Sequence, residues 1–326
     1  MPFERFDRSR LHLLPLRDRI HDVDRRVMMS PQAPAPSFSH PALEPLARRI
    51  VAASQERRAV ILACGAHVLR EGAGPLLIDW MARGLLTHLA LNGAGAIHDF
   101  ELAMIGATCE SVARYVREGQ FGLWRETGHF NEAAVEAAKE DIGLGEALGR
   151  MIEREGFPYR ETSVLAAGVR LGVPVTVHVA FGQDIVHEHP NFDPQATGIA
   201  TYNDFLVFCR SVEDLEGGVF LNIGTAVMGP EVYLKALAMA RNVAHRQGRS
   251  IRHFTTAVFD MAAPEEGIDT VPPKTDPRYY FRPLKTVLVR TVADGGESFS
   301  IRGPHRQMLP ALYHAVIAAA KRSDVH

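Results

Sequence analysis

After about residue 41 the chain alternates between short, continuously apolar runs and longer segments with helical spacing. The apolar runs are AVILACG, THLALNG, VPVTVHVA, GGVFLNIG and IRHFTTAVFD, and amphipathic segments such as TSVLAAGVRLG separate them. One long helical stretch, NEAAVEAAKEDIGLGEALGRMIERE, lies in the middle. Strands that are apolar throughout are typical of parallel sheets covered by helices on both faces. The alternation therefore predicts an α/β fold with a doubly wound, mostly parallel sheet.

The start of the chain lacks this alternation. The segment MMSPQAPAPSFSHPALEP is rich in proline and serine, so we expect no ordered core before about residue 41. The sequence thus predicts an irregular N-terminal arm over residues 1–40 and a single α/β domain over residues 41–326. Such an arm either wraps a partner subunit or is loose.

Composition argues for a small-molecule ligand. The chain has 326 residues and a formal net charge of -2, and its acidic and basic residues are interleaved. We therefore expect neither a basic stripe that would bind nucleic acid nor a polybasic patch that would bind a membrane. No apolar run approaches the roughly 20 residues of a membrane span. Cys64, Cys109 and Cys209 have no CxxC spacing and the charged N-terminus has no signal-peptide pattern, so we expect a cytoplasmic protein.

Glycine beside polar groups follows four of the predicted strands, in GAHVLREG, NGAGAIHDFE, FGQDIVHEH and GTAVMGPE. The carboxyl ends of parallel strands meet at one edge of the sheet, where ligands bind. Glycine lets backbone approach a ligand, and the N–H groups of a following helix can hold a phosphate. None of these segments has G-x-G-x-x-G spacing, but together they favour a dinucleotide. The expected cofactor-binding residues are Gly65, Ala66, His67, Asn92, Gly93, Gly95, Asp184, Gly224, Thr225 and Asp260.

Three titratable residues, His98, Asp99 and Glu101, follow the predicted strand THLALNG at the start of a helix. A carboxylate at that position often serves only as a helix cap. One side chain suffices for a cap, however, and histidine is the usual proton shuttle near neutral pH. The sequence supports the structural and the catalytic interpretation equally, and we take all three as catalytic candidates.

Histidines are densest around the strand VPVTVHVA, which contains His178 and is followed by His187 and His189. In an extended segment His187 and His189 would face the same side and, with His178, would offer ligands to a metal. A histidine-rich loop without an i, i+4 pair is more often an active-site wall or a solvated turn. We therefore expect no metal and keep His187 as a catalytic candidate.

The order of these segments, from GAHVLREG through RHFTTAVFD, resembles the deoxyhypusine synthase family from about residue 57 to the C-terminus. The segment NGAGAIHDFE also resembles the NAD-binding domain of bacterial and archaeal ornithine cyclodeaminases. The resemblance implies a Rossmann-like sheet that binds NAD, and homotetramers with active sites near subunit interfaces. It also implies oxidation of a C–N centre by NAD with later reuse of the hydride.

One departure from the deoxyhypusine synthase pattern limits this inference. In that family a lysine after a Trp-Gly pair forms an imine, but the corresponding region here reads KTDPRYYFRPLKTVLVR, which places Pro283 at the lysine position. Proline cannot form an imine. Lys285 lies two residues on, about 7 Å away in the extended segment that we expect to lead into a strand. The family's paired histidines are also replaced, by TAVMGPE.

Three hypotheses follow from the sequence. The first is a divergent deoxyhypusine synthase-like enzyme, NAD-dependent, of transferase or lyase type, acting on a small amine or amino acid without the imine lysine unless Lys285 replaces it. The second is a metal-assisted hydrolase or lyase that uses the histidine cluster. The third is a non-catalytic nucleotide-binding or scaffold protein.

Overall fold

The computed structural model describes residues 3–266 and 268–323. Its centre is a six-stranded sheet, parallel throughout, in the order β5-β3-β2-β6-β7-β8. The strands are β2 (Val60–Cys64), β3 (His88–Asn92), β5 (Val175–His178), β6 (Val219–Ile223), β7 (Thr255–Asp260) and β8 (Glu297–Arg302). Counted along the chain, these six strands have the order 3-2-1-4-5-6 of Rossmann-type sheets. The predicted doubly wound α/β fold is confirmed.

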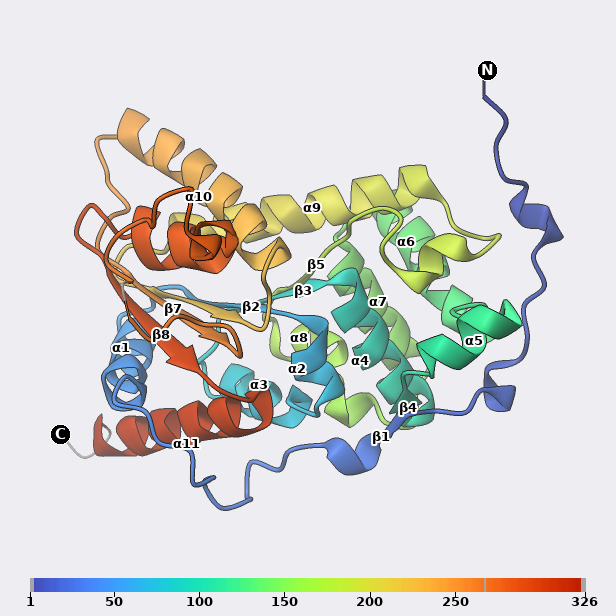
Figure 1. The fold of residues 1–326 in the computed structure, drawn as a ribbon, viewed down its shortest axis with the longest axis horizontal. Helices are drawn as coiled ribbons and strands as arrows, with labels where there is room; N and C mark the ends of the chain where they lie inside the picture. The colour runs from blue at the N-terminus through green and yellow to red at the C-terminus, as the bar shows by residue number, and fades with distance from the viewer. Residues whose placement is uncertain (1–2, 267, 324–326) are drawn as a thin grey trace.

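Helices cover both faces of the sheet (Figure 1). One face carries α1 (Leu43–Gln55), α2 (Ala66–Arg70), α3 (Gly74–Ala82), α4 (Gly93–Ile105), α8 (Val164–Leu171) and α11 (His305–Ser323). The other face carries α9 (Pro194–Glu213), α10 (Met228–Arg246) and the π-helical segment η8 (Leu284–Arg290). Beyond the β5 edge lie α6 (His129–Glu140) and α7 (Leu144–Arg154), and α5 (Val112–Glu118) is at the surface.

Strand β2 illustrates why the apolar runs had to become central strands. Val60, Leu62 and Cys64 pack into the core beneath α1 and α11, whereas Ile61 and Ala63 pack beneath α9 and α10. All five side chains are fully buried. Successive side chains on a strand point to opposite faces, so a strand covered on both sides must be apolar at every position.

Two segments differ from the sequence-based expectation. The segment after Pro283 is not a strand but the π-helical η8, because Leu284, Val287 and Leu288 recur at helical spacing and bury one stripe against the α10 side of the sheet. The last strand is β8, about ten residues further on. Its edge position leaves its first residues only half-buried, so it lacks the apolar run of the central strands.

The long central helical stretch forms two helices, α6 and α7, instead of one. Asp141 ends α6 in the left-handed conformation, with φ +54°, and Gly143 precedes α7. A Cβ at Gly143 would lie 2.0 Å from the carboxylate of Asp204 on α9. The break is therefore set by a contact with a helix about sixty residues away in sequence.

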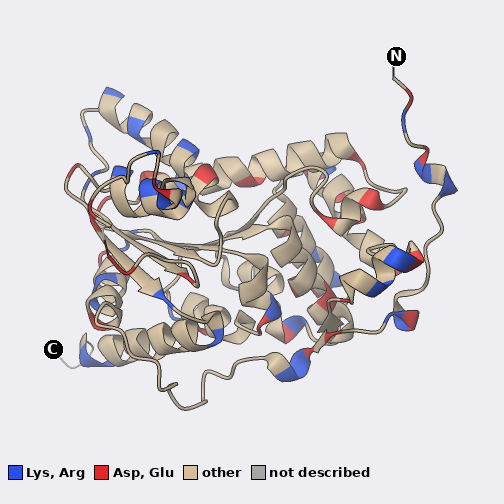
Figure 2. Cartoon of the chain, in the orientation of Figure 1, with Lys and Arg blue, Asp and Glu red and all other residues tan. Residues whose placement is uncertain are grey.

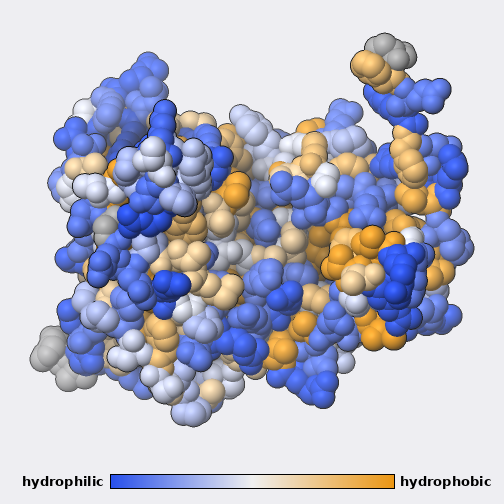
Figure 3. Space-filling view, viewed as in Figure 1, coloured by the Kyte–Doolittle hydropathy of each residue, from blue (hydrophilic) through white to orange (hydrophobic). Residues whose placement is uncertain are grey.

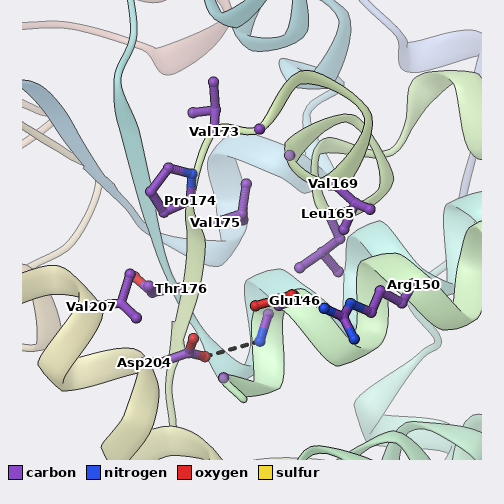
Figure 4. A pocket seen from close by; sticks show the side chains of 14 residues that line it. Glu146, Arg150, Leu165, Val169, Val173, Pro174, Val175, Thr176, Asp204 and Val207 are labelled. Carbon is purple, nitrogen blue, oxygen red and sulfur yellow. Dashed lines mark hydrogen bonds and ion pairs between the residues drawn. The ribbon is translucent and has the colours of Figure 1, made fainter.

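Asp204 also closes the outer edge of β5. Its carboxylate accepts hydrogen bonds from the N–H groups of Val177 (2.8 Å) and Gly145 (2.9 Å). On the same helix, the Thr201 hydroxyl accepts from Val179 N–H and donates to the Val177 carbonyl. Satisfied edge groups cannot pair with another chain. In Figure 4 Asp204 is drawn beside β5 with its bond to the start of α7.

The arm contains only short elements, namely η1 (Arg8–Arg10), η2 (Leu16–Asp18), η3 (Arg25–Val27) and β1 (Val23–Asp24), which pairs with β4 (Ala107–Thr108). These short elements lie against the domain. Leu16 is buried in a small cluster with Tyr115 and Trp124. The proline-rich segment did not predict these contacts, because the apolar residues that make them precede it in the sequence.

Arg19 fixes the arm by a buried ion pair with Glu101 of α4. The guanidinium donates to both carboxylate oxygens at 2.8 Å, and both side chains are 1% exposed. Thr108 and Thr127 also donate hydroxyl hydrogens to this carboxylate. Burial alone would raise the pKa of Glu101, but Arg19 and the two hydroxyls outweigh it and lower the pKa. Glu101 is therefore a charged structural anchor.

Basic and acidic residues alternate along most elements in Figure 2, whereas the outer half of α10 carries only basic ones. Apolar residues gather on that face between α4 and α5 (Figure 3), and Val112 and Val116 of α5 are among the exposed apolar side chains. No helix within residues 3–266 and 268–323 is both long enough and apolar enough to cross a membrane.

Replacing Arg19 with Met should lower the free energy of unfolding by about 3–5 kcal/mol at pH 7, because Glu101 is left buried without its partner. The control Arg17→Met, whose side chain is 86% exposed, should change it by less than about 0.5 kcal/mol. The folded pKa of Glu101 is depressed, so its stabilisation is present above about pH 4.3 and is lost as the pH falls through the folded pKa. Urea unfolding should therefore show a smaller gap between wild type and Arg19→Met at pH 3. Equal losses for the two variants would contradict the anchor.

Candidate functional site

The exits of β2 and β6 touch at the point where the strand order reverses. A Cβ on Gly65 would lie 1.8 Å from the carbonyl oxygen of Gly224. Gly224 itself has φ +60°, and a Cβ there would lie 2.8 Å from Nε2 of His305. Both positions therefore require glycine. Crevices at such a reversal of strand order are where open α/β sheets bind their ligands.

The backbone N–H groups at the start of α4 are already hydrogen-bonded by protein side chains. The Asn92 side chain accepts from Gly95 N–H at 3.0 Å, and the Asp184 carboxylate accepts from the Ala94 N–H. A Cβ on Gly93 would lie 2.0 Å from that carboxylate. Burial raises the pKa of Asp184 to about 6, and the Ala94 hydrogen bond opposes this. Four of the predicted cofactor-binding residues therefore lie together here, namely Asn92, Gly93, Gly95 and Asp184. The Asp184 carboxylate, however, occupies the position at the helix start where an anionic ligand would bind.

Helices α2 and α10 begin differently, since neither has a side-chain cap on its N-cap residue, Gly65 and Val227 respectively. Ala66 and His67 form the first turn of α2, and His67 is exposed. In the turn before α10, the Thr225 hydroxyl accepts from Gly229 N–H at 3.0 Å. Thr225 therefore caps the start of α10, and of these two helices only α2 begins without a side-chain acceptor for its first N–H groups.

His305, at the start of α11, is a site residue that the sequence-based assignment missed. Its Nδ1 is buried and has no hydrogen-bond partner among the described residues. Burial lowers its pKa, while the charges of Glu71 and Asp260 oppose this. Asp260 ends β7 and accepts from Ala262 N–H at 2.8 Å. The sequence carries a signal for His305 in IRGPH, where β8 is followed by α11, but a strand predicted directly after Pro283 does not lead to it.

A hollow of about 370 Å³ opens at the exit of β5. His178, Thr201, Val232 and the aromatic rings of Phe181, Tyr202 and Phe205 line it. Val232 belongs to α10, so the hollow lies between α9 and α10 at the carboxyl edge of the sheet. A second hollow, of about 490 Å³, lies at the start of β5 among residues of α7, α8 and α9 (Figure 4). It is at the opposite end of the strand from the glycine-rich exits.

His98, Asp99 and Glu101 do not form one group. Nδ1 of His98 lies 2.9 Å from the Thr108 hydroxyl, and burial lowers the pKa of His98 to about 4. Asp99 caps α8, accepting from Ser163 Oγ at 2.5 Å and from the next two backbone N–H groups. Glu101 is engaged by Arg19. The two carboxylates have structural partners, and we do not carry them forward as proton-transfer groups.

His178, which ends β5, and the two histidines after it are also separate. His178 Nε2 lies 3.0 Å from Thr176 Oγ1, His187 Nδ1 accepts from Asp184 N–H at 3.1 Å, and His189 Nε2 lies 2.9 Å from the Gly122 carbonyl. The extended geometry that would align His187 and His189 is absent, because residues Ile185–Glu188 form the 3-10 turn η6. Within the described part of the chain, no three side chains of the metal-binding types are grouped to hold a metal.

Lys285 lies on η8 with its ammonium 4.1 Å from the centre of the Tyr279 ring. Residues 284–290 are helical, so the two-residue step from Pro283 to Lys285 follows a helical turn. The expected separation of about 7 Å, which assumed an extended segment, is therefore wrong. The lysine makes a cation–π contact.

No protein-family model matches the chain, and no curated protein matches it. Among solved structures, AgrE with ornithine and NAD+ has 11% identity and a TM-score of 0.46 over 88% of this chain and 34% of that one. A candidate LOR/SDH protein from Methanococcus maripaludis S2 has 13% identity and a TM-score of 0.48, covering 91% and 74% of the two chains. A candidate deoxyhypusine synthase from Entamoeba histolytica has 9% identity and a TM-score of 0.49, covering 85% and 88%. The chain spans about a third of AgrE. With TM-scores below 0.5, these likenesses carry no argument about function.

Replacing Asp99 with Ala should lower the free energy of unfolding by about 1–3 kcal/mol, because the first N–H groups of α8 lose a buried acceptor. Ser111→Ala is the matched control, since Ser111 caps the surface helix α5 at 3.4 Å. It should cost about 0.5 kcal/mol. Denaturant titration of both variants measures the difference, and a smaller loss for Asp99→Ala than for Ser111→Ala would refute the capping role.

Proposed function

We propose that this chain is an NAD-dependent enzyme that acts on a small amine or amino acid. The observation that carries the cofactor assignment is the contact between Gly65 and Gly224 in a sheet whose strands run 3-2-1-4-5-6. That arrangement places the starts of two helices, α2 and α10, on either side of the point where the strand order reverses. Dinucleotides lie across such crevices with their pyrophosphate at a helix N-terminus.

The residues present fit the two ends of a dinucleotide differently. The half of the edge formed by β2, β3 and β5 has the hollow with Phe181, Tyr202 and Phe205, which suits the flat, apolar face of adenine. The half formed by β6, β7 and β8 has Thr225, Asp260 and His305. We place the nicotinamide over this second half, where the orphaned Nδ1 of His305 offers a hydrogen-bonding position.

NAD supplies hydride transfer when it is bound. The protein's part is to position the substrate and manage its protons. Burial lowers the pKa of His305, so its imidazole is neutral near pH 7 and able to accept a proton from an ammonium group. Pro283 offers no amine, so the reaction proceeds without the enzyme-bound imine of deoxyhypusine synthases.

The substrate class and the assembly rest on the resemblance of GAHVLREG, NGAGAIHDFE and the later segments to the deoxyhypusine synthase family. We extend the proposal to a divergent, cytoplasmic member of that family that forms a homo-oligomer with sites near its subunit interfaces. Asp184, which occupies the start of α4, is then a positioning group for the loop after β5 and for the adjoining cofactor half.

Millimolar NAD should raise the melting temperature by several degrees. A ligand present at 100 times its Kd adds about 2.7 kcal/mol to the stability of the native state. Tyr202→Ala removes one wall of the adenine hollow and should reduce the shift by at least half. Tyr280→Ala, a surface aromatic that is 70% exposed, should leave it unchanged. Differential scanning fluorimetry with NAD, NADH and NADP measures these shifts, and the absence of any shift with all three would overturn the proposal.

A further inference from the structure

The end of α2 meets the start of α11 beside Gly224 (Figure 1). The Arg306 guanidinium on α11 donates to the backbone carbonyl of Glu71, the residue that follows α2, at 3.1 Å. A Cβ on Gly224 would lie 2.8 Å from Nε2 of His305 and 3.2 Å from Cγ2 of Val68 on α2. The last turn of α2 and the first turn of α11 are therefore in contact at this point.

Asp260 adjoins the same point. The Gly224 N–H donates to the Phe259 carbonyl at 2.9 Å, and Asp260 is the next residue, at the end of β7. Oδ1 of Asp260 accepts from Ala262 N–H at 2.8 Å. A carboxylate has about four lone-pair sites, so most of its capacity to accept hydrogen bonds is left. The negative charge of Asp260 acts on His305, whose pKa it raises against the effect of burial.

Two buried atoms at this junction have no hydrogen-bond partner in the described part of the chain, namely Oε2 of Glu71 and Nδ1 of His305. His305 is 6% exposed, and Glu71 is half-buried. The sequence neighbours of His305, Pro304 and Arg306, are exposed, so the two unpaired atoms lie just beneath the surface. Buried polar atoms of native proteins nearly always have a partner. Two unpaired atoms at one junction therefore indicate a ligand that pairs with both.

The partner that is missing is a hydrogen-bond donor. An ionised carboxylate only accepts hydrogen bonds. Burial lowers the pKa of His305, so its ring is neutral near pH 7, and in the tautomer protonated at Nε2 its Nδ1 accepts. Glu71, Asp260 and His305 thus offer three acceptors at one place. Hydrogen bonds between carboxylates and a cationic donor are stronger than those to a neutral donor, so a cation fits this set best.

We propose that Glu71, Asp260 and His305 hold the primary ammonium group of the substrate. The inference rests on the proposed function, which places the nicotinamide over this same half of the edge. An ammonium group has three N–H donors, one for each acceptor. The two carboxylates supply the negative charge that a cation needs when it leaves water. The site therefore selects primary amino groups and excludes quaternary ammonium groups, which have no N–H.

This placement puts Nδ1 of His305 next to the nitrogen from which the ring takes a proton. One N–H bond of the ammonium group breaks and one Nδ1–H bond forms, which leaves a neutral amine and an imidazolium. The imidazolium then lies beside Glu71 and Asp260, and nearby negative charges favour the charged form of a histidine. The same two carboxylates thus bind the ammonium group and stabilise the product of its deprotonation.

Titration with n-butylammonium chloride tests the site with the recognised group alone. NMR of ¹⁵N-labelled protein, recorded with and without millimolar NAD, should show saturable binding. n-Butyltrimethylammonium, a cation of the same charge without an N–H, should bind about tenfold more weakly or worse. Equal affinity for the two cations would overturn the proposal, and so would the lack of saturable n-butylammonium binding in both conditions.

Substitutions of single carboxylates locate the binding. Glu71→Gln keeps the shape of the side chain and removes its charge, so it should raise the Kd for n-butylammonium about tenfold. Asp260→Asn should raise it similarly, and it tests the site if Glu71→Gln fails to fold. Glu265→Gln, in the loop after β7, is the matched control, since that side chain is 69% exposed and 4.0 Å from Arg302. It should change the Kd by less than about twofold.

The outcomes separate this site from the proposed function. Unchanged affinity in Glu71→Gln and Asp260→Asn, or an equal loss in all three variants, would overturn the ammonium site. Binding of n-butylammonium that depends on Glu71, in a protein whose melting temperature does not respond to NAD, would support the site and refute the cofactor assignment. A melting-temperature shift with NAD but no n-butylammonium binding would overturn the site and leave the cofactor assignment standing.

Discussion

The contact between Gly65 and Gly224 is the constraint on which the rest of the edge depends. Because the carbonyl of Gly224 stands where a side chain of residue 65 would be, the exits of β2 and β6 meet without side chains between them. The chain then diverges to opposite faces, into α2 and α10. His305 lies against Gly224, and the aromatic hollow at β5 lies apart from the polar groups at β7 and β8.

Buried carboxyl groups hold the surrounding elements in place. Asp204 satisfies the edge of β5 and the start of α7, Asp99 caps α8, and Glu101 binds Arg19 of the arm. Each of these residues is at most 4% exposed. A carboxyl group that is buried to this extent needs hydrogen bonds or an ion pair. The acidic residues of this edge thus serve mainly to fix the scaffold.

Sequence patterns were sufficient for features with local causes. Fully apolar runs predicted β2, β3, β5, β6 and β7, because a strand that is buried on both faces needs apolar side chains at nearly every position. They failed at η8 and β8, where edge position and packing against α10 override local propensity. They also could not assign Asp99 or Glu101, whose partners Ser163 and Arg19 lie 64 and 82 residues away in the chain. The role of a side chain at the candidate site depends on such distant partners. The spacing of residues within one segment does not reveal them.

The central claim is that a dinucleotide lies across the crevice between β2 and β6. A crystal structure of the protein soaked with NAD tests it most directly. The account predicts density for the pyrophosphate beside Gly65 and the start of α10, with adenine in the hollow lined by Tyr202 and Phe205. Density confined to the larger hollow at the start of β5, or a crevice that stays empty at millimolar NAD, would contradict it.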